Sequence, residues 1–272
     1  MSHLREEGWQ VTVLPVDATG PVAPADLAAA LRADTVLVSV MRANNEVGTL
    51  QPIAELAALA KAQRILFHTD AAQSTGKIVV DVGALGVDLL TLAGHKFFAP
   101  KGIGALYVRG GTPLVPITFG AGHERRLRPG TENVPYIVGL GAAAELAQRR
   151  LPAIIDRLQA QRDALHGRLA ASIASLVLNG HPDDRLANTL NVSFPGVSGR
   201  ELLAGAPLVA ASVGSACHEE ANGVSGVLAA MGIGFERALG AVRLSIGEPT
   251  TDDEIRQAAD ALVATWRSLR SS

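Results

Sequence analysis

A histidine and a lysine stand side by side in a largely apolar stretch, DLLTLAGHKFFAPKGIG, residues 88–104. Lysine is rarely buried unless a partner compensates its charge, so a lysine at a strand end is usually a surface residue. An amine held in a partly dry pocket, however, has a lowered pKa and can form a Schiff base as a nucleophile. Lys96, next to His95, is therefore the first candidate for chemistry.

A carboxylate and an amide form the second group of candidates, in HTDAAQSTGK, residues 68–77. Asp70 ends an apolar run and Gln73 follows one turn later. Asp70 can cap the N-terminus of a short helix, and its carboxylate can also pair with a protonated ring nitrogen. A pyridoxal phosphate site needs both a lysine for the imine and an acid for the pyridinium nitrogen.

Alternating strands and helices are expected to position these groups. The predicted strands are 10–16, 35–41, 64–70 and 87–94, and the predicted helices between them are 24–33 and 53–62. This order predicts an α/β fold with a mostly parallel sheet covered on both faces. Ligands bind such sheets beyond the carboxyl ends of the strands, where Asp70 and Lys96 both stand.

The second half of the chain predicts a smaller α/β unit. A strand at 104–110 and a Gly/Arg-rich loop at 119–134 come first, and a long helical stretch, 136–170, follows with an expected break or kink at Pro152. After it we expect strands at 188–194 and 241–247, an extended run at 207–213, and helices at 199–206 and 251–270. The predicted division is a large domain over 1–135 and a small domain over 136–272.

Composition excludes several classes of protein. The 272 residues carry a formal charge of -2, which does not favour nucleic acid or an anionic membrane as a partner. No run approaches the length of a spanning helix and the N-terminus has no export signal, so a cytoplasmic protein is expected. Scattered histidines and one cysteine, Cys217, lack metal-ligand spacing, and no disulfide can form within the chain.

Five motifs in order carry a resemblance to a known family. They are MRANNEVGTLQPI (41–53), HTDAAQSTGK (68–77), GHKFFAPKGIGALYVRGG (94–111), GAGHERRLRPGTENV (120–134) and SVGSACHEE (212–220). Together they resemble the class V aminotransferase-type pyridoxal phosphate enzymes, in the branch of cysteine desulfurases and selenocysteine lyases. The resemblance implies the fold type I architecture of pyridoxal phosphate-dependent transferases, with the sheet domain large and the C-terminal domain small.

The resemblance also implies roles around the cofactor, pyridoxal 5'-phosphate. Lys96 would form the imine, and Asp70 would keep the ring nitrogen protonated. Gln73 would bond the 3-hydroxyl and His95 would reach the phosphate. Thr131 would reach the phosphate of a neighbouring subunit's cofactor, which implies a homodimer.

Three further residues would handle the substrate. Asn45 would lie beside the substrate carboxylate and the ring, and Arg243 would clamp that carboxylate with two parallel hydrogen bonds. Cys217 would take the sulfur as a persulfide, and its small, polar surroundings, GSACHEEANG, favour an accessible thiolate. Taken alone, Arg243 is more often a structural salt-bridge residue and Cys217 an inert buried thiol.

The implied function is a pyridoxal phosphate-dependent cysteine desulfurase, which converts L-cysteine to L-alanine and leaves a persulfide for a sulfur-acceptor protein. The alternatives are a selenocysteine lyase acting on L-selenocysteine, another class V aminotransferase, and a non-catalytic fragment. Members of the family have an N-terminal part of the large domain that this sequence does not match. We therefore expect an incomplete large domain with uncovered apolar sheet surface, and weak or no activity unless a complementary piece is present.

Overall fold

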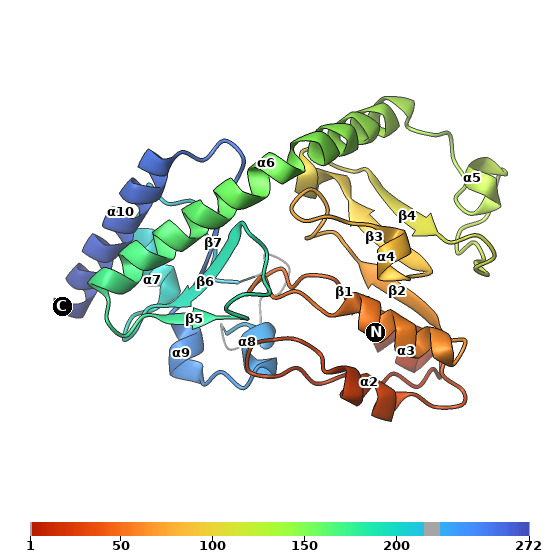
Figure 1. Ribbon diagram of the computed structural model, residues 1–272, viewed down its shortest axis with the longest axis horizontal. Helices are drawn as coiled ribbons and strands as arrows, with labels where there is room; N and C mark the ends of the chain where they lie inside the picture. Colours follow the sequence, from red (N-terminus) through yellow and green to blue (C-terminus); the bar gives the residue numbers. More distant parts are fainter. Residues whose placement is uncertain (1, 215–223, 272) are drawn as a thin grey trace.

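The computed structural model describes residues 2–214 and 224–271, which form two sheets linked by one long helix (Figure 1). The elements of the first part are α1 (Ser2–Glu6), α2 (Pro24–Ala30), β1 (Leu37–Met41), α3 (Ile53–Ala62), β2 (Leu66–Asp70), α4 (Val82–Leu85), β3 (Leu89–Ala93), the 3-10 helix η1 (Gly94–Phe97), β4 (Gly104–Val108) and α5 (His123–Arg126). Those of the second part are α6 (Val134–Ser172), β5 (Val177–Asn179), β6 (Thr189–Ser193), α7 (Gly199–Gly205), α8 (Gly226–Ala230), α9 (Phe235–Leu239), β7 (Ala241–Ser245) and α10 (Asp252–Ser271).

The first sheet has the strand order β1-β2-β3-β4. The first three strands run parallel and β4 pairs antiparallel with β3, which confirms the mostly parallel α/β sheet. The register aligns Met41, Asp70 and Thr91 across the three parallel strands. Because these residues are at or near the carboxyl ends, the polar residues that follow each strand meet at one edge.

Helices cover only one face of this sheet. The buried strand residues Val38, Phe67 and Leu90 pack with Leu56 of α3 in one apolar cluster. On the other face, Leu37, Met41 and Leu106 are 48%, 41% and 47% exposed. The prediction of a sheet covered on both faces is therefore wrong for the described residues, and the expected uncovered apolar surface is present.

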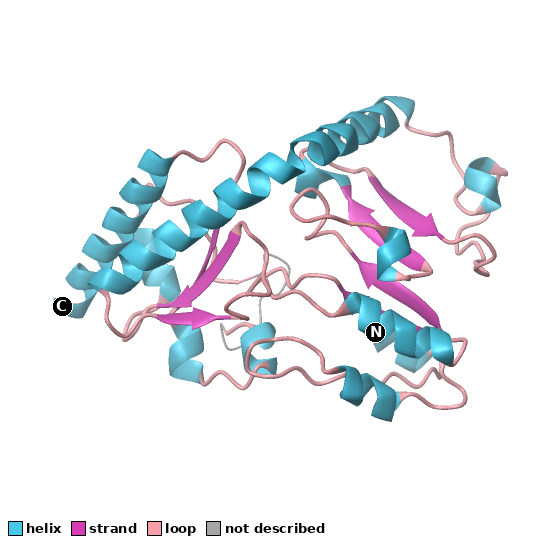
Figure 2. Ribbon diagram, in the orientation of Figure 1, coloured by secondary structure: helices cyan, strands magenta, loops and turns pink. Residues whose placement is uncertain are grey.

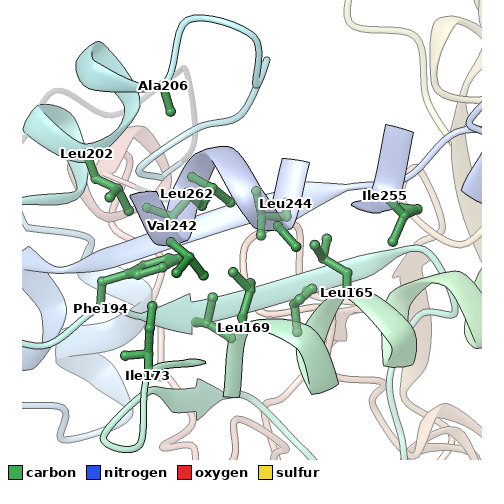
Figure 3. Close-up of a cluster of buried hydrophobic side chains, with 14 of the residues drawn as sticks. Leu165, Leu169, Ile173, Phe194, Leu202, Ala206, Val242, Leu244, Ile255 and Leu262 are labelled. Carbon is green, nitrogen blue, oxygen red and sulfur yellow. The ribbon is translucent and has the colours of Figure 1, made fainter. Parts of the chain in front are cut away.

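The second sheet is fully antiparallel, in the order β5-β6-β7. Its core packs α6 and α10 against β6 and β7, and Figure 3 shows the side chains of this cluster interleaved between helices and strands. The labelled members are Leu165, Leu169, Ile173, Phe194, Leu202, Ala206, Val242, Leu244, Ile255 and Leu262. The second α/β unit expected from the sequence is thus present, while the exact division into 1–135 and 136–272 stays a prediction.

Helix α6 reaches both units, as the ribbon views show (Figures 1 and 2). Asn133 caps its start by accepting a hydrogen bond from Tyr136 N–H at 3.3 Å. Near that end Ala143 packs with Phe97 of η1, and near the other end Leu165 packs in the core of the second sheet. The helix continues through Pro152, so the break predicted as one of the two alternatives does not occur, while the other alternative, a kink, stays a prediction.

Two predicted extended segments differ in the structure. Residues 10–16 are not paired in either sheet; Leu14 and Val16 pack on the first core while Val13 is exposed, because no neighbouring strand accepts this stretch. Residues 207–213 contribute only a single bridge, between Ser212 and Arg243. None of the described helices combines the length and apolarity required to cross a bilayer.

Candidate active site

Asp70 is the last residue of β2 and holds its carboxylate at the carboxyl edge of the first sheet. Its Oδ1 accepts a hydrogen bond from Ala72 N–H at 2.8 Å, and its backbone carbonyl accepts one from Arg42 N–H at 2.8 Å. The short helix that Asp70 is expected to cap does not form: residues 72–77 are turns, and the Asp70 carboxylate makes a local side-chain-to-backbone bond instead. None of the described residues donates to Oδ2, which leaves that oxygen able to accept from a ligand.

A row of hydrogen bonds runs across the sheet beside Asp70. His68 lies two residues earlier on the same face of β2. Its Nδ1 is 2.8 Å from Ser39 Oγ and its Nε2 is 2.8 Å from Thr91 Oγ1. Burial lowers the pKa of His68, and the charge of Asp70 offsets part of that effect. The neutral His68 ring, with one donor and one acceptor, therefore links β1, β2 and β3 on the face of β2 that also carries Asp70.

Lys96 lies on the 3-10 helix η1, which follows β3 directly. Phe97 is buried and anchors this turn, whereas His95 and Lys96 are both exposed. The turn ends at Phe98, which takes a left-handed conformation with φ 70°. Because strand β3 pairs with β2 up to Asp70 and Thr91, the lysine turn and the carboxylate belong to neighbouring strand ends.

Gln73 and Lys77 form a pair at the same edge. Lys77 Nζ donates to Gln73 Oε1 at 3.1 Å. Burial is the main cause, with the positive charges of Lys96 and Arg243 adding to it, and together they lower the pKa of Lys77 to about 8. Lys77 thus contacts Gln73 and is close enough to Lys96 and Arg243 for their charges to affect its pKa.

Lys77 was not among the residues singled out from the sequence. The available signal was its position, four residues after Gln73 and directly after a glycine in the turn that follows a buried strand. No spacing rule separates such a lysine from an ordinary surface lysine, so only the fold identifies it.

Arg243 reaches the first sheet from β7 of the second. Its Nη1 donates to the backbone carbonyl of Asn45 at 2.8 Å, and its main chain pairs with Ser212. Its Nε is buried and has no hydrogen-bond partner in the described part of the chain. No carboxylate of the described residues forms a salt bridge with Arg243, so the structural alternative suggested by the sequence is not observed there. A guanidinium that donates from Nη1 to a carbonyl and has another N–H without a partner is suited to bind a planar anion.

The loop that carries Arg243's neighbour Asn45 is clamped between the two units. Asn44 Oδ1 accepts from the N–H groups of Glu46 and Val47 at 2.8 and 3.0 Å. The buried Asn191 of β6 donates to the carbonyl of Glu46 at 3.1 Å. These bonds hold Asn45 in place between a strand end of each sheet.

Two of the expected site residues are not joined to this group. Thr131 is exposed in the loop between α5 and α6. Among the hydrogen bonds of the described residues, none joins the His95 side chain to Asp70, Gln73, Lys96 or Arg243. Cys217 lies outside the described residues. Within the described ranges no group of three His, Cys, Asp or Glu side chains could hold a metal ion.

Comparison with known proteins gives consistent matches over almost the whole chain. The family model for Aminotransferase class-V matches residues 1–257. A protein named Cysteine desulfurase IscS from Methanosarcina thermophila is 44% identical over 270 residues, which are 98% of this chain and 67% of that relative. A solved NifS-like protein superimposes with a TM-score of 0.89 at 35% identity, covering 97% of this chain and 70% of the other. A structure of SspA in complex with cysteine has a TM-score of 0.73 at 36% identity, covering 90% of this chain and 68% of the other.

Proposed function

Because the chain belongs to the class V aminotransferase family, as its motifs predicted, we propose that it acts as a pyridoxal phosphate-dependent cysteine desulfurase on L-cysteine. The names of its relatives support the reaction, and the cysteine bound to SspA supports the substrate. The single observation that carries the proposal is the placement of Asp70, Gln73 and Lys96 after the ends of neighbouring strands, with Arg243 of β7 bonded to the loop that follows β1.

The residues at this edge fit pyridoxal phosphate. A lysine amine, a carboxylate oxygen without a donor and an amide are the groups that the cofactor's aldehyde, ring nitrogen and 3-hydroxyl require. We assign Lys96 to the covalent bond, Asp70 to the ring nitrogen, and Gln73 to the 3-hydroxyl, with His95 and Thr131 at phosphates. When bound, the cofactor supplies an electron sink for charge that develops at the substrate's α-carbon.

The chain's own groups handle the substrate in this proposal. Arg243 binds the α-carboxylate through its unused N–H groups, and Asn45, fixed in the loop beside it, limits how the carboxylate can turn. The Lys96 amine carries the α-proton. Cys217 accepts the substrate's sulfur as a persulfide, and L-alanine leaves.

The lysine assignment is tested by borohydride reduction followed by mass spectrometry. Wild-type chain should carry the reduced cofactor on Lys96, and Lys96→Ala should carry none. Lys101→Ala, which removes an exposed lysine five positions later, is the matched control and should behave as wild type. A cofactor adduct on any other lysine of the wild-type chain would refute the assignment.

The thiol assignment needs a separate variant. Cys217→Ala should keep the cofactor's absorption and lose persulfide formation and sulfur release from L-cysteine. Sulfide production equal to wild type would reject this role. Alanine release from L-cysteine and from L-selenocysteine, measured on the same preparation, distinguishes a desulfurase from a selenocysteine lyase.

A homodimer is the assembly that gives Thr131 a cofactor to contact. The same region, before α5, exposes Ile117 and Phe119 at 91% and 86%, which favours burial against another surface. Sedimentation of the cofactor-loaded protein tests this. Release of the persulfide sulfur to an acceptor protein and a cytoplasmic location complete the proposal.

A further inference from the structure

Lys77 is a partly buried cation inside the proposed site that has no role in the chemistry described so far. Taking a charged amine out of water is costly, and here two further cations, Lys96 and Arg243, act on it. No carboxylate of the described residues forms a salt bridge with it. A partly buried group held at such a cost is a candidate for function.

The contact that Lys77 makes has a direction. An ammonium group has only donors, so it can bond the oxygen of the Gln73 amide but never the nitrogen. The observed bond joins Lys77 Nζ to Gln73 Oε1 at 3.1 Å. With Oε1 engaged in this way, the NH₂ end of the amide is the end left for a ligand, and it can only donate.

The backbone holds Lys77 against the lysine turn. Gly76, the preceding residue, has φ +75° and approaches η1 so closely that a Cβ added to it would lie 2.7 Å from Phe97 Cβ. Phe97 is 3% exposed and directly follows Lys96. The backbone that leads into Lys77 is therefore held by packing against the turn that carries Lys96.

We propose that Lys77 is a positioning residue of the cofactor site: it locks the Gln73 amide so that the amide's NH₂ group donates to the 3-hydroxyl oxygen of pyridoxal phosphate. This inference rests on the proposed function, because it needs the cofactor ring beside Gln73. Lys77 itself touches neither substrate nor cofactor. It acts by excluding the flipped orientation of the Gln73 amide, in which Oε1 would face the 3-hydroxyl oxygen of the cofactor.

The orientation of this amide has a measurable consequence. A donor to the 3-hydroxyl oxygen withdraws charge from that oxygen, which otherwise holds the proton on the nitrogen of the lysine–cofactor bond. Removing the donor should therefore raise the pH at which that nitrogen loses its proton. We expect a rise of about one pH unit in the midpoint of the cofactor's absorption titration, a tenfold change in the proton-dissociation constant.

The experiment compares five variants with wild type, one of them the Gln73→Leu single variant and one the double variant. Lys77→Met removes the donor with little change in length, and Lys77→Arg keeps a cation that can still donate to Oε1. Lys61→Met, at an exposed position of α3, is the control for loss of a lysine. Gln73→Leu is combined with Lys77→Met because two residues that act as a unit should show non-additive effects.

The expected result is a raised midpoint in Lys77→Met, a midpoint near wild type in Lys77→Arg and Lys61→Met, and no further effect of Lys77→Met in the Gln73→Leu background. An unchanged midpoint in Lys77→Met, or an equal shift in both backgrounds, overturns the proposal. Cofactor bound elsewhere than Lys96, or not bound at all, refutes the proposed function and this inference with it.

A second measurement does not need the cofactor. In the cofactor-free protein, the side-chain amide resonance of Gln73, assigned with Gln73→Leu, should move in Lys77→Met and stay near its position in Lys77→Arg. A resonance that Lys77→Met leaves in place shows that the ammonium does not hold the amide, and the proposal is then wrong whether or not the cofactor binds.

Discussion

Replacing Gly76 by alanine tests the packing that fixes the two site lysines relative to each other. The new Cβ would lie 2.7 Å from Phe97 Cβ, closer than two carbon atoms can approach, and the residue has φ +75°. An L-residue in the left-handed region costs about 1–2 kcal/mol. Forcing an extra methyl into a packed site costs about 1–3 kcal/mol more. We expect Gly76→Ala to lower the free energy of unfolding by about 2–5 kcal/mol.

Gly232 provides a matched control. Its φ of +73° is almost the same, but a Cβ there would meet nothing within 4 Å. Gly232→Ala therefore bears only the backbone cost, about 1–2 kcal/mol. The small stabilisation that alanine gives by restricting the unfolded chain applies equally to both variants and cancels in their difference.

Urea unfolding followed by circular dichroism gives the two free energies, provided that the denaturant slopes agree. The difference between the variants should be about 1–3 kcal/mol, with Gly76→Ala the less stable. Equal losses in the two variants would refute the reasoning, because the contact between Gly76 and Phe97 would then carry no energy. The yield of cofactor that borohydride traps on Lys96 should also differ between Gly76→Ala and wild type, since the added methyl group displaces the turn that carries Lys96.

Two further predictions concern the same edge of the sheet. The pKa of Lys77 is lowered to about 8 in the folded protein from its ordinary 10.5. Between these values the unfolded chain binds one more proton than the folded chain, so stability rises with pH. The urea midpoint of wild type, measured relative to that of Lys77→Met, should therefore increase as the pH is raised from about 8 to about 10.5. The adjacent phenylalanines should differ sharply: Phe97→Ala, at a 3% exposed position, should cost about 3–5 kcal/mol, whereas Phe98→Gly, at a 76% exposed position with φ 70°, should change stability by less than about 1 kcal/mol, both measured by denaturant unfolding.

The sequence was most informative where one apolar run ends in a polar residue. The run 64–70 predicted β2 and the position of Asp70, and the Pro52-led run 53–62 matches α3 at both ends. Such segments bury one continuous set of apolar side chains, so local pattern and tertiary packing agree. The five motifs predicted the family, and the family model confirms it.

Where the sequence failed, the deciding contacts lie far apart along the chain. Residues 10–16 have the alternation of a strand, but pairing depends on a neighbour that the alternation cannot specify. Pro152 predicts a break or kink, yet α6 does not break there, because packing at both of its ends outweighs the lost hydrogen bond. Lys77 gains its significance from Gln73 within its own turn and from Arg243, which is remote in sequence.

Because α6 is continuous, it fixes the rotation of one packed end relative to the other about the helix axis, as well as the distance between them. One stretch of this helix packs on η1, which carries Lys96, and another on the strand layer that carries Arg243. A single residue inserted between Ala143 and Leu158 would turn everything beyond it by about 100° and advance it by about 1.5 Å. Lys96 and Arg243 would then lose their present relative placement, although every individual contact within each sheet could persist. The relative placement of the two sheets should therefore tolerate substitutions on the outer side of α6 but not the insertion or deletion of a residue within it.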